Sequence, residues 1–307
     1  MRYTLRQLEV FLAVARSESV SRAAEELGMS QSAVSGALAD LEQQFNVQLF
    51  DRIGKRLRSN GLGRSLRPRG EALVEQAREL EALLCSPDSL GPLHIGATLT
   101  IGNYVAMPLV ARFLNQHPGA RIELQIANTA EIARKVQNFE IDVGLVEGEL
   151  HEKDLQVIPW CEDELVVFCA PGHAFCRSPA LSDAELLKAV WIAREPGSGT
   201  RQAFEHAMHG ILSDLDIRFE LPDTEAIKSA VAAGMGVGCV SRIALADAVR
   251  LGSLVPCSVP HRDFRRQFFF VLHEEKHRGP ALDSWLTLCS SWSTASSSSA
   301  GERNLQT

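Results

Sequence analysis

The sequence lacks the features of a secreted, membrane-spanning or zinc-binding protein. Its seven cysteines are an odd number and include no C-x-x-C pair, so they predict neither a disulfide framework nor a zinc site. No segment approaches the ~18 consecutive apolar residues that a membrane-spanning helix needs. The start of the chain carries charged residues where a signal peptide would have an apolar core. We therefore expect a cytoplasmic protein with no membrane partner, no bound metal and no cofactor.

Acidic residues outnumber basic ones, but the imbalance is uneven along the chain. The net charge is −7 over 307 residues. Residues 1–70 hold 11 Lys and Arg against 7 Asp and Glu, a balance of +4, which leaves −11 for the remainder. A basic N-terminal segment on an acidic body suits a DNA-binding module fused to a larger domain, and the length allows two or three domains.

Residues 20–45 have the pattern of two short helices joined by a tight turn. Residues 28–30 interrupt the first helix, and residues 31–45 form the second. The apolar face of the second helix carries Val34, Leu38, Leu41 and Phe45. The opposite face carries short or uncharged side chains, namely Gln31, Ser32, Ser35, Gly36 and Ala39. This layout is typical of a helix-turn-helix that lays a helix in the DNA major groove, although paired helices also occur in proteins that never touch DNA.

A strip of positive charge follows these helices. From residue 52 to residue 69 there is no Asp or Glu, and the basic residues are Arg52, Lys55, Arg56, Arg58, Arg64, Arg67 and Arg69. Such a run is often only a solvated face. Beside a polar-faced helix, it favours a basic wing that contacts DNA phosphates.

The order and spacing of five motifs resemble the LysR family of bacterial transcriptional regulators. The motifs lie at residues 5–11, 21–27, 30–35, 41–42 and 49–52. Within the family the chain is most similar to the YeiE/CysL-like subgroup, which is associated with sulfur metabolism and with sulfite as a signal. That closer match rests on residues 100–104, 162–168, 197–201 and 225–228. The chain departs from the family at Gly36, where many members have a basic residue, and at residues 61–64, which replace the usual Leu-Thr-x-x-Gly.

The resemblance implies a regulator rather than an enzyme, with an α+β multidomain fold. An N-terminal winged helix-turn-helix would precede a long linker helix and a C-terminal two-lobed α/β effector domain of the type 2 periplasmic-binding-protein kind. The alternation of strand and helix patterns after residue 93 agrees with such lobes. The expected boundaries are residues 1–60 for the winged helix-turn-helix, 61–86 for the linker and dimerisation helix, 87–92 for a hinge, 93–292 for the effector domain (lobe I about 93–163 and 267–292, lobe II about 164–266) and 293–307 for a disordered serine-rich tail.

The linker segment carries a short apolar seam at Leu73, Ala77, Leu80 and Leu84, with heptad-like spacing. In the LysR family this segment pairs two subunits, so the resemblance implies a homo-oligomer, either a dimer or a tetramer. The alternative is a helix that lies on its own domain.

The expected macromolecular partner is double-stranded promoter DNA, with RNA polymerase as a further candidate. Gln31, Ser32 and Ser35 would face the bases. Ser30, Arg52, Lys55 and Arg56 would anchor phosphates.

The expected effector site lies at the carboxyl ends of strands, where helix N-termini favour anions. The candidate residues are Thr98, Thr100, Asn128, Glu147, Ser198, Gly199 and Thr200. Hydroxyls at these positions also suit plain helix caps. The subgroup resemblance and the hydroxyl-rich site favour a small oxyanion such as sulfite or sulfate, and an organic acid or amino-acid-related metabolite is the competing effector. A solute-binding protein and an anion-handling enzyme are the rival classes.

Glu147 is unexpected beside an anion site, because a carboxylate repels an anion unless a cation pairs with it. Two roles are open. Glu147 is a structural partner for Arg201 or another cation, or it is a built-in competitor that occupies the donors when no effector is present.

Cys161, Cys169 and Cys176 are close in sequence and could form a redox sensor. No basic residue closely flanks Cys161 or Cys169, and Cys169 lies in an apolar strand. The pattern therefore favours buried, inert thiols.

Overall fold

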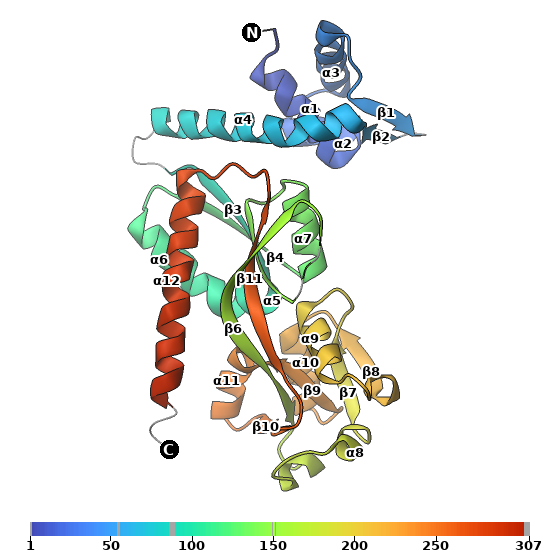
Figure 1. The fold of residues 1–307 in the computed structure, drawn as a ribbon, viewed down its shortest axis with the longest axis vertical. Helices are drawn as coiled ribbons and strands as arrows, with labels where there is room; N and C mark the ends of the chain where they lie inside the picture. The colour runs from blue at the N-terminus through green and yellow to red at the C-terminus, as the bar shows by residue number, and fades with distance from the viewer. Residues whose placement is uncertain (1, 54–55, 86–89, 149, 151, 304–307) are drawn as a thin grey trace.

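The computed structural model describes residues 2–53, 56–85, 90–148, 150 and 152–303. Figure 1 shows a small N-terminal head, a long helix that crosses one end of the molecule, and an elongated body built on a twisted sheet. The expected arrangement of a helix-turn-helix head, a linker helix and a C-terminal α/β domain is confirmed.

The head is a three-helix unit with a two-stranded wing. Its elements are α1 (Leu5–Ser17), α2 (Val20–Leu27), α3 (Gln31–Phe45), β1 (Phe50–Ile53) and β2 (Arg56–Ser59). Thr4, Ser19 and Ser30 cap the three helices with their side chains. Gly28 ends α2 at φ 62°, a left-handed conformation that glycine adopts without strain and that turns the chain into α3.

Helix α4 (Gly61–Cys85) leaves the head and forms the linker. The side chain of Asn60 caps its first turn by accepting a hydrogen bond from the Gly63 amide at 2.9 Å. At Gly70 an added Cβ would lie 3.2 Å from Leu8 and Leu12 of α1, so this glycine allows α4 to pack closely on the head. The head core therefore includes part of the linker helix, and Val74 is buried in it.

The side of α4 that faces the body makes polar contacts with it. Arg67 donates to the backbone oxygen of Asn138 at 2.5 Å. Lys276 contacts Glu75 of α4 at 3.5 Å and Asp142 of the body at 2.6 Å. These contacts hold the linker helix against its own effector domain. Leucines elsewhere on α4 remain exposed, so contact with its own domain and an outward apolar surface coexist on this helix.

The body contains one continuous nine-stranded sheet of order β4-β3-β5-β11-β6-β9-β7-β8, with β10 beside β6. Its strands are β3 (Pro92–Thr98), β4 (Arg121–Ala127), β5 (Val143–Glu147), β6 (Leu155–Cys169), β7 (Val190–Arg194), β8 (Asp216–Leu221), β9 (Val237–Ser241), β10 (Val255–Cys257) and β11 (Arg265–His273). The pairs among β4, β3 and β5 and among β8, β7 and β9 are parallel, whereas β6 and β11 pair antiparallel with their neighbours.

Strands β6 and β11 join the two halves of the sheet. Strand β6 pairs with β11 as far as Glu164 and with β9 from Leu165 onward. The chain thus enters lobe II on β6 and returns on β11, which gives two lobes connected by two long strands (Figure 1).

Helices cover both faces of each lobe. They are α5 (Leu99–Ile101), a π-helical turn η1 (Gly102–Ala106), α6 (Met107–Gln116), α7 (Thr129–Gln137), the 3₁₀ turn η2 (Ala174–Arg177), α8 (Asp183–Leu186), α9 (Gly199–Ala207), the 3₁₀ turn η3 (Leu212–Asp214), α10 (Thr224–Ala232), α11 (Arg242–Arg250) and α12 (Pro280–Arg303). Separate apolar cores form in the lobes, one around Phe113 and Trp285 and another around Trp191 and Phe204.

Two features differ from what the apolar runs of the sequence predict. The run at residues 165–169 predicts a short strand, but β6 begins earlier, at Leu155, and β10 is not predicted. Helix α12 runs from Pro280 to Arg303 and so includes most of the serine-rich segment. Within the described residues, no helix combines the length and the apolarity needed to cross a membrane.

Candidate functional site

Helix α3 presents a polar, exposed face. Gln31, Ser32 and Ser35 are exposed, while Val34 and Leu38 on the other side are buried in the head core. The Ser30 hydroxyl accepts a hydrogen bond from the Ala33 amide at 3.1 Å and lies 3.0 Å from the Ser32 hydroxyl. The four residues expected on the DNA-facing side therefore share one end of α3.

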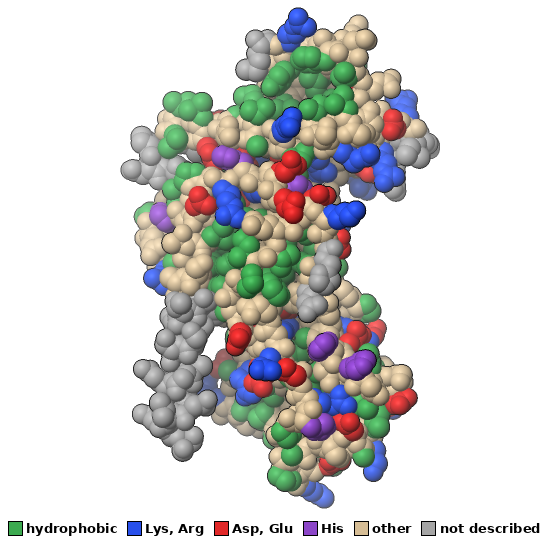
Figure 2. Space-filling view, in the orientation of Figure 1, with side chains coloured by type: hydrophobic (Ala, Val, Ile, Leu, Met, Phe, Trp, Pro, Cys, Tyr) green, Lys and Arg blue, Asp and Glu red, His purple; other side chains and the backbone are tan. Residues whose placement is uncertain are grey.

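The wing places basic residues beside this helix. Arg52 is exposed on β1, opposite Leu57 of β2, and Arg58 is also exposed. Arg56 belongs to β2, and Lys55 lies outside the described residues. A cavity of about 610 Å³ lies between the head and lobe I, lined by five arginines together with Glu18 and by Asn138 of lobe I. Two of these arginines are already engaged, Arg16 by Glu71 and Arg67 by Asn138. Figure 2 shows Lys and Arg side chains gathered beneath the wing.

A second polar cluster lies inside the body, where the two lobes meet. Glu147, at the end of β5, is only 1% exposed. Its carboxylate accepts hydrogen bonds from Thr98, from Thr100 at 3.1 Å and from Thr200 at 3.4 Å. Thr98 and Thr100 come from lobe I and Thr200 from lobe II, so the cluster bridges the lobes.

Arg266 supplies the positive charge of this cluster. Its Nη1 lies 3.7 Å from Glu147 and donates to the Thr200 hydroxyl at 2.9 Å. Its Nε donates to Asp163 at 2.7 Å, and Asp163 also accepts from the Ser241 hydroxyl at 2.7 Å. A buried cation is thus balanced by two buried carboxylates, as charges removed from water require.

Arg266 was absent from the residues expected in the effector site. Its sequence signal was the alternation in β11, where Arg266, Phe268 and Phe270 point inward while Arg265 is exposed. A charged residue in phase with buried phenylalanines indicates a buried ion pair.

The loop before α9 closes against lobe I. The Thr129 hydroxyl donates to the Glu147 backbone oxygen at 2.9 Å and accepts from the Gly199 amide at 3.1 Å. At Gly199 a Cβ would overlap the Glu147 backbone, so glycine is required for this approach. The Ala130 amide donates to the Gly197 oxygen at 3.2 Å. The structure is therefore closed at this edge of the interlobe cleft.

The helix-cap alternative applies to only part of the expected set. Asn128 caps α7 by accepting from the Glu131 amide at 3.0 Å. Thr98 and Ser198 occupy N-cap positions of α5 and α9 but make no side-chain capping bond. Ser198 and Thr200 are both buried beside the cluster. Most of these hydroxyls therefore serve the interlobe contact rather than a helix end.

Arg201 is not the partner of Glu147. Its guanidinium pairs with Glu205 at 2.6 Å and with Glu220 at 2.6 Å, both on lobe II. Of the cations considered as partners of Glu147, Arg201 is therefore wrong, and the other cation is Arg266.

A second interlobe contact lies at Tyr104. Its hydroxyl donates to Glu225 of lobe II, and Lys228 lies 2.7 Å from Glu225 and over the Tyr104 ring. Burial and the neighbouring Glu225 carboxylate raise the pKa of Tyr104 well above its usual range. The phenol therefore remains a donor to Glu225 at neutral pH.

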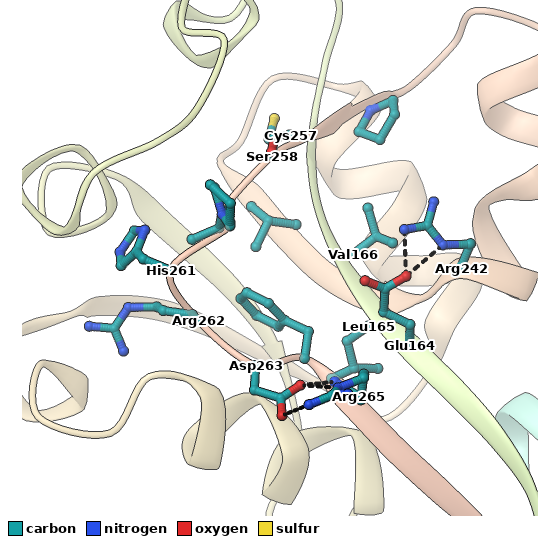
Figure 3. Close-up of a pocket in the computed structure, with 15 residues that line it drawn as sticks. Glu164, Leu165, Val166, Arg242, Cys257, Ser258, His261, Arg262, Asp263 and Arg265 are labelled. Carbon is teal, nitrogen blue, oxygen red and sulfur yellow. Dashed lines mark hydrogen bonds and ion pairs between the residues drawn. The ribbon is translucent and has the colours of Figure 1, made fainter. Parts of the chain in front are cut away.

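A larger surface cavity of about 700 Å³ lies at the far end of lobe II. Figure 3 shows two ion pairs among its lining residues, Arg242 with Glu164 and Arg265 with Asp263. A third cation of the lining, Arg262, pairs with Asp183. None of the expected effector-site residues lines it. The charges of this cavity form separate pairs, whereas hydroxyls from both lobes and a guanidinium converge on one carboxylate in the interlobe cluster. The interlobe cluster is therefore the better candidate effector site.

Among the described residues, no group of three or more His, Cys, Asp or Glu side chains has an arrangement that could hold a metal ion.

The exposed helix-turn-helix, the linker helix and the two-lobed body define a DNA-binding regulator with an effector-binding domain. Residues 5–64 match the helix-turn-helix model of the bacterial regulatory lysR family, and residues 88–293 match the LysR substrate binding domain. The chain belongs to the LysR family of transcriptional regulators, which are not enzymes.

Individual relatives agree with this assignment. The chain is 43% identical to an uncharacterized HTH-type transcriptional regulator, YeiE, of Escherichia coli over 94% of this chain and 98% of the relative. It is 31% identical to the HTH-type transcriptional regulator CysL of Bacillus subtilis over 78% of this chain and 80% of the relative. The fold also resembles a full-length variant of OxyR from Pseudomonas aeruginosa, with a TM-score of 0.67 at 19% identity, covering 94% of this chain and 96% of that chain.

Proposed function

We propose that this LysR-family regulator senses a small sulfur oxyanion, such as sulfite or sulfate, at the interlobe cluster. The observation that carries the proposal is the environment of Glu147. Three hydroxyls and the Arg266 guanidinium surround its carboxylate. A carboxylate is itself an oxyanion, so Glu147 stands in the protein for the negatively charged oxygens of an effector.

This arrangement favours the competitor role for Glu147. An entering oxyanion would accept hydrogen bonds from Thr98, Thr100 and Thr200 and take the charge of Arg266, and Glu147 would move away. Because Thr200 belongs to lobe II and the other two threonines to lobe I, exchanging the carboxylate for an effector changes how the lobes are held. Such a ligand shifts the equilibrium between lobe arrangements by the difference in its affinity for them.

The size of the site favours a small effector. The donors converge on one carboxylate, and the loop at Gly199 already contacts the Glu147 backbone. A small oxyanion could take the place of the Glu147 carboxylate with little change in the separation of the lobes. An organic acid with a larger carbon skeleton would need the lobes to separate further.

The DNA-binding head would read the operator with Gln31, Ser32 and Ser35. Ser30, Arg52, Lys55 and Arg56 would anchor phosphates. The exposed leucines of α4 would pair two subunits, so that the protein binds DNA in the cytoplasm as a dimer or a tetramer. Effector-dependent lobe movement would then change the spacing of the heads through the contacts between α4 and lobe I.

Isothermal calorimetry with sulfite, sulfate and a panel of organic acids tests the effector. We expect a sulfur oxyanion to bind, and Arg266→Lys to weaken that binding at least about tenfold because lysine cannot form the same forked contacts. Arg201→Lys is the matched control, since Arg201 is adjacent to Thr200 but pairs with Glu205 and Glu220. Binding of an organic acid, without binding of sulfite or sulfate, would show that the effector is an organic acid. Equal sulfite affinity in wild type and Arg266→Lys would show that sulfite binds elsewhere than at the interlobe cluster.

A further inference from the structure

Three cysteines from separate parts of the sequence lie together at the far end of lobe II. The Sγ of Cys169, at the end of β6, lies 3.5 Å from the Sγ of Cys176 and 3.5 Å from the Sγ of Cys257. Cys176 belongs to the 3₁₀ turn η2 and Cys257 to β10. These distances place Cys169 in van der Waals contact with two other thiols.

The local sequence explains why Cys176 returns to the end of β6. Ala170, Pro171, Gly172 and His173 form a tight turn, with the His173 amide donating to the Ala170 oxygen at 3.2 Å. Gly172 has φ 85°, and proline followed by glycine is the preferred pair at the centre of such a turn. The turn reverses the chain and lays η2 over Cys169.

Strand pairing places the third thiol. Strand β10 runs antiparallel to β6, with Val255 opposite Cys169 and Cys257 opposite Val167. Cys257 is therefore two residues along β10 from the partner of Cys169, on the same face of the sheet. This diagonal position brings the two sulfur atoms together.

The three thiols differ in access to solvent. Cys176 is exposed, Cys257 is partly buried and Cys169 is buried. An oxidant from solution therefore meets Cys176 first, and the nearest thiol able to react with the oxidised sulfur is that of Cys169.

We propose that Cys176 and Cys169 form a thiol–disulfide switch, with Cys176 as the entry thiol and Cys169 as the resolving thiol. The Cys176 thiol loses its proton, and the thiolate attacks the terminal oxygen of a hydroperoxide. The O–O bond breaks, the alkoxide or hydroxide that leaves takes up that proton to become an alcohol or water, and Cys176 becomes a sulfenic acid. The Cys169 sulfur then attacks the Cys176 sulfur, and the hydroxyl leaves as water with the proton of the Cys169 thiol. The hydroperoxide is reduced by two electrons and the thiol pair is oxidised by two.

The required movement is small. A disulfide needs the sulfur atoms about 2.05 Å apart, so the Cys169–Cys176 pair must close by roughly 1.5 Å. The short turn η2, at the surface of the lobe, provides that movement more readily than the paired strands β6 and β10. This is why Cys176 rather than Cys257 is assigned as the first partner of Cys169.

Burial opposes direct oxidation of the other two thiols. Desolvation raises the pKa of Cys169 well above its usual range, and it also raises that of Cys257. Both therefore remain protonated thiols until an oxidised Cys176 is present beside Cys169.

Peptide mapping of the full-length protein after treatment with hydrogen peroxide tests the proposal. We expect a loss of two hydrogens from the intact mass and a cross-linked peptide pair that joins Cys169 to Cys176. Cys176→Ser should abolish the cross-link. Cys169→Ser should leave the sulfenic acid of Cys176 unresolved, so that dimedone labels it at a level at least about tenfold above wild type.

Cys161→Ser is the matched control, because Cys161 is partly buried and burial raises its pKa to about 12. This variant should form the Cys169–Cys176 cross-link as wild type does. Peroxide treatment that yields only over-oxidised Cys176 in wild type, without a cross-link, would overturn the proposal. A Cys169–Cys257 cross-link that forms equally well in Cys176→Ser would overturn the assignment of Cys176 as the entry thiol.

Discussion

Glu147 and Arg266 lie inside the body with Oε1 and Nη1 only 3.7 Å apart. They stand on neighbouring strands, where Phe268 of β11 is paired with Glu147 of β5. Arg266 is two residues from Phe268 and therefore points to the same side of the sheet. The buried Glu147 carboxylate thus pairs with the cation, Arg266, to which an anionic effector would bind.

Replacing Glu147 with glutamine should tighten oxyanion binding. The substitution removes a negative charge that competes for Arg266 while keeping the side-chain shape. We expect an affinity gain of about tenfold, equivalent to ~1.4 kcal/mol, measured by calorimetry with sulfite and sulfate. Glu220→Gln is the control, because Glu220 pairs with Arg201 on lobe II. Weaker binding by Glu147→Gln would show that Glu147 supports the site instead of competing for it.

Thr200→Val should weaken oxyanion binding, because it preserves the shape of the side chain and removes its hydroxyl. A hydrogen bond to a charged group contributes about 1.5–3 kcal/mol, so the dissociation constant should rise by roughly ten- to a hundredfold. Thr287→Val on α12 removes a hydroxyl that bonds only a helix carbonyl and should leave affinity unchanged. A lower melting temperature with unchanged oxyanion affinity would show that Thr200 stabilises the fold and does not bind the effector.

Sequence patterns predicted local elements better than the site. The range expected for α3, residues 31–45, is confirmed because its cap at Ser30 and its apolar spacing are local signals. The first half of β6 was missed because residues 155–164 lack a continuous apolar run and gain their strand structure by pairing with β11. Thr98, Thr100 and Glu147 were proposed for the candidate site from their positions at the ends of strands. Their partner Arg266 lies more than a hundred residues from both Glu147 and Asp163, so only the fold brings these charges together.

The cysteines show the same limit. Sequence proximity suggested grouping Cys161, Cys169 and Cys176, and the absence of flanking charge favoured inert thiols. In the structure the free thiol of Cys169 contacts those of Cys176 and Cys257, and Cys257 takes the place expected for Cys161. Cys257 is 88 positions from Cys169 in the sequence, and strand pairing, which a linear pattern does not reveal, places it there.

Arg52→Ala should weaken binding to all DNA sequences to the same degree. Arg52 is exposed on the wing, where a phosphate contact carries no base information. Loss of one such contact should reduce the slope of log K against log salt by about one unit in fluorescence-anisotropy titrations. Arg250→Ala on α11 removes an equivalent charge from lobe II and should leave the slope unchanged. A changed base preference with the slope preserved would contradict the phosphate assignment.

Gln31→Ala should change the preferred DNA sequence. Its amide lies exposed in the first turn of α3, and a glutamine amide can pair with the edge of an adenine. Selection of binding sites from a random DNA pool should lose stringency at one position per half-site, at a cost of about 1–3 kcal/mol for the preferred base. Gln43→Ala, near the opposite end of α3, is the control. Recovery of the wild-type motif at full stringency by Gln31→Ala would place Gln31 away from the bases.

If the exposed leucines of α4 pair two subunits, as proposed above, Leu80→Glu should convert the protein into monomers. Leu80 is 60% exposed and Leu84 79% exposed on α4, and Figure 2 shows apolar side chains at the free end of this helix. If two linker helices pair through these leucines, a glutamate at position 80 places a charge in an apolar contact, where burial without a partner is strongly unfavourable. Light scattering should then report the mass of one chain at concentrations where wild type is at least dimeric.

Leu251→Glu is the matched control, since Leu251 is 76% exposed on lobe II, remote from α4, and its substitution should leave the mass unchanged. Circular dichroism would check that both variants remain folded. A folded Leu80→Glu protein with the wild-type mass would exclude α4 as the dimer contact and leave contact with its own lobe I as the role of this helix.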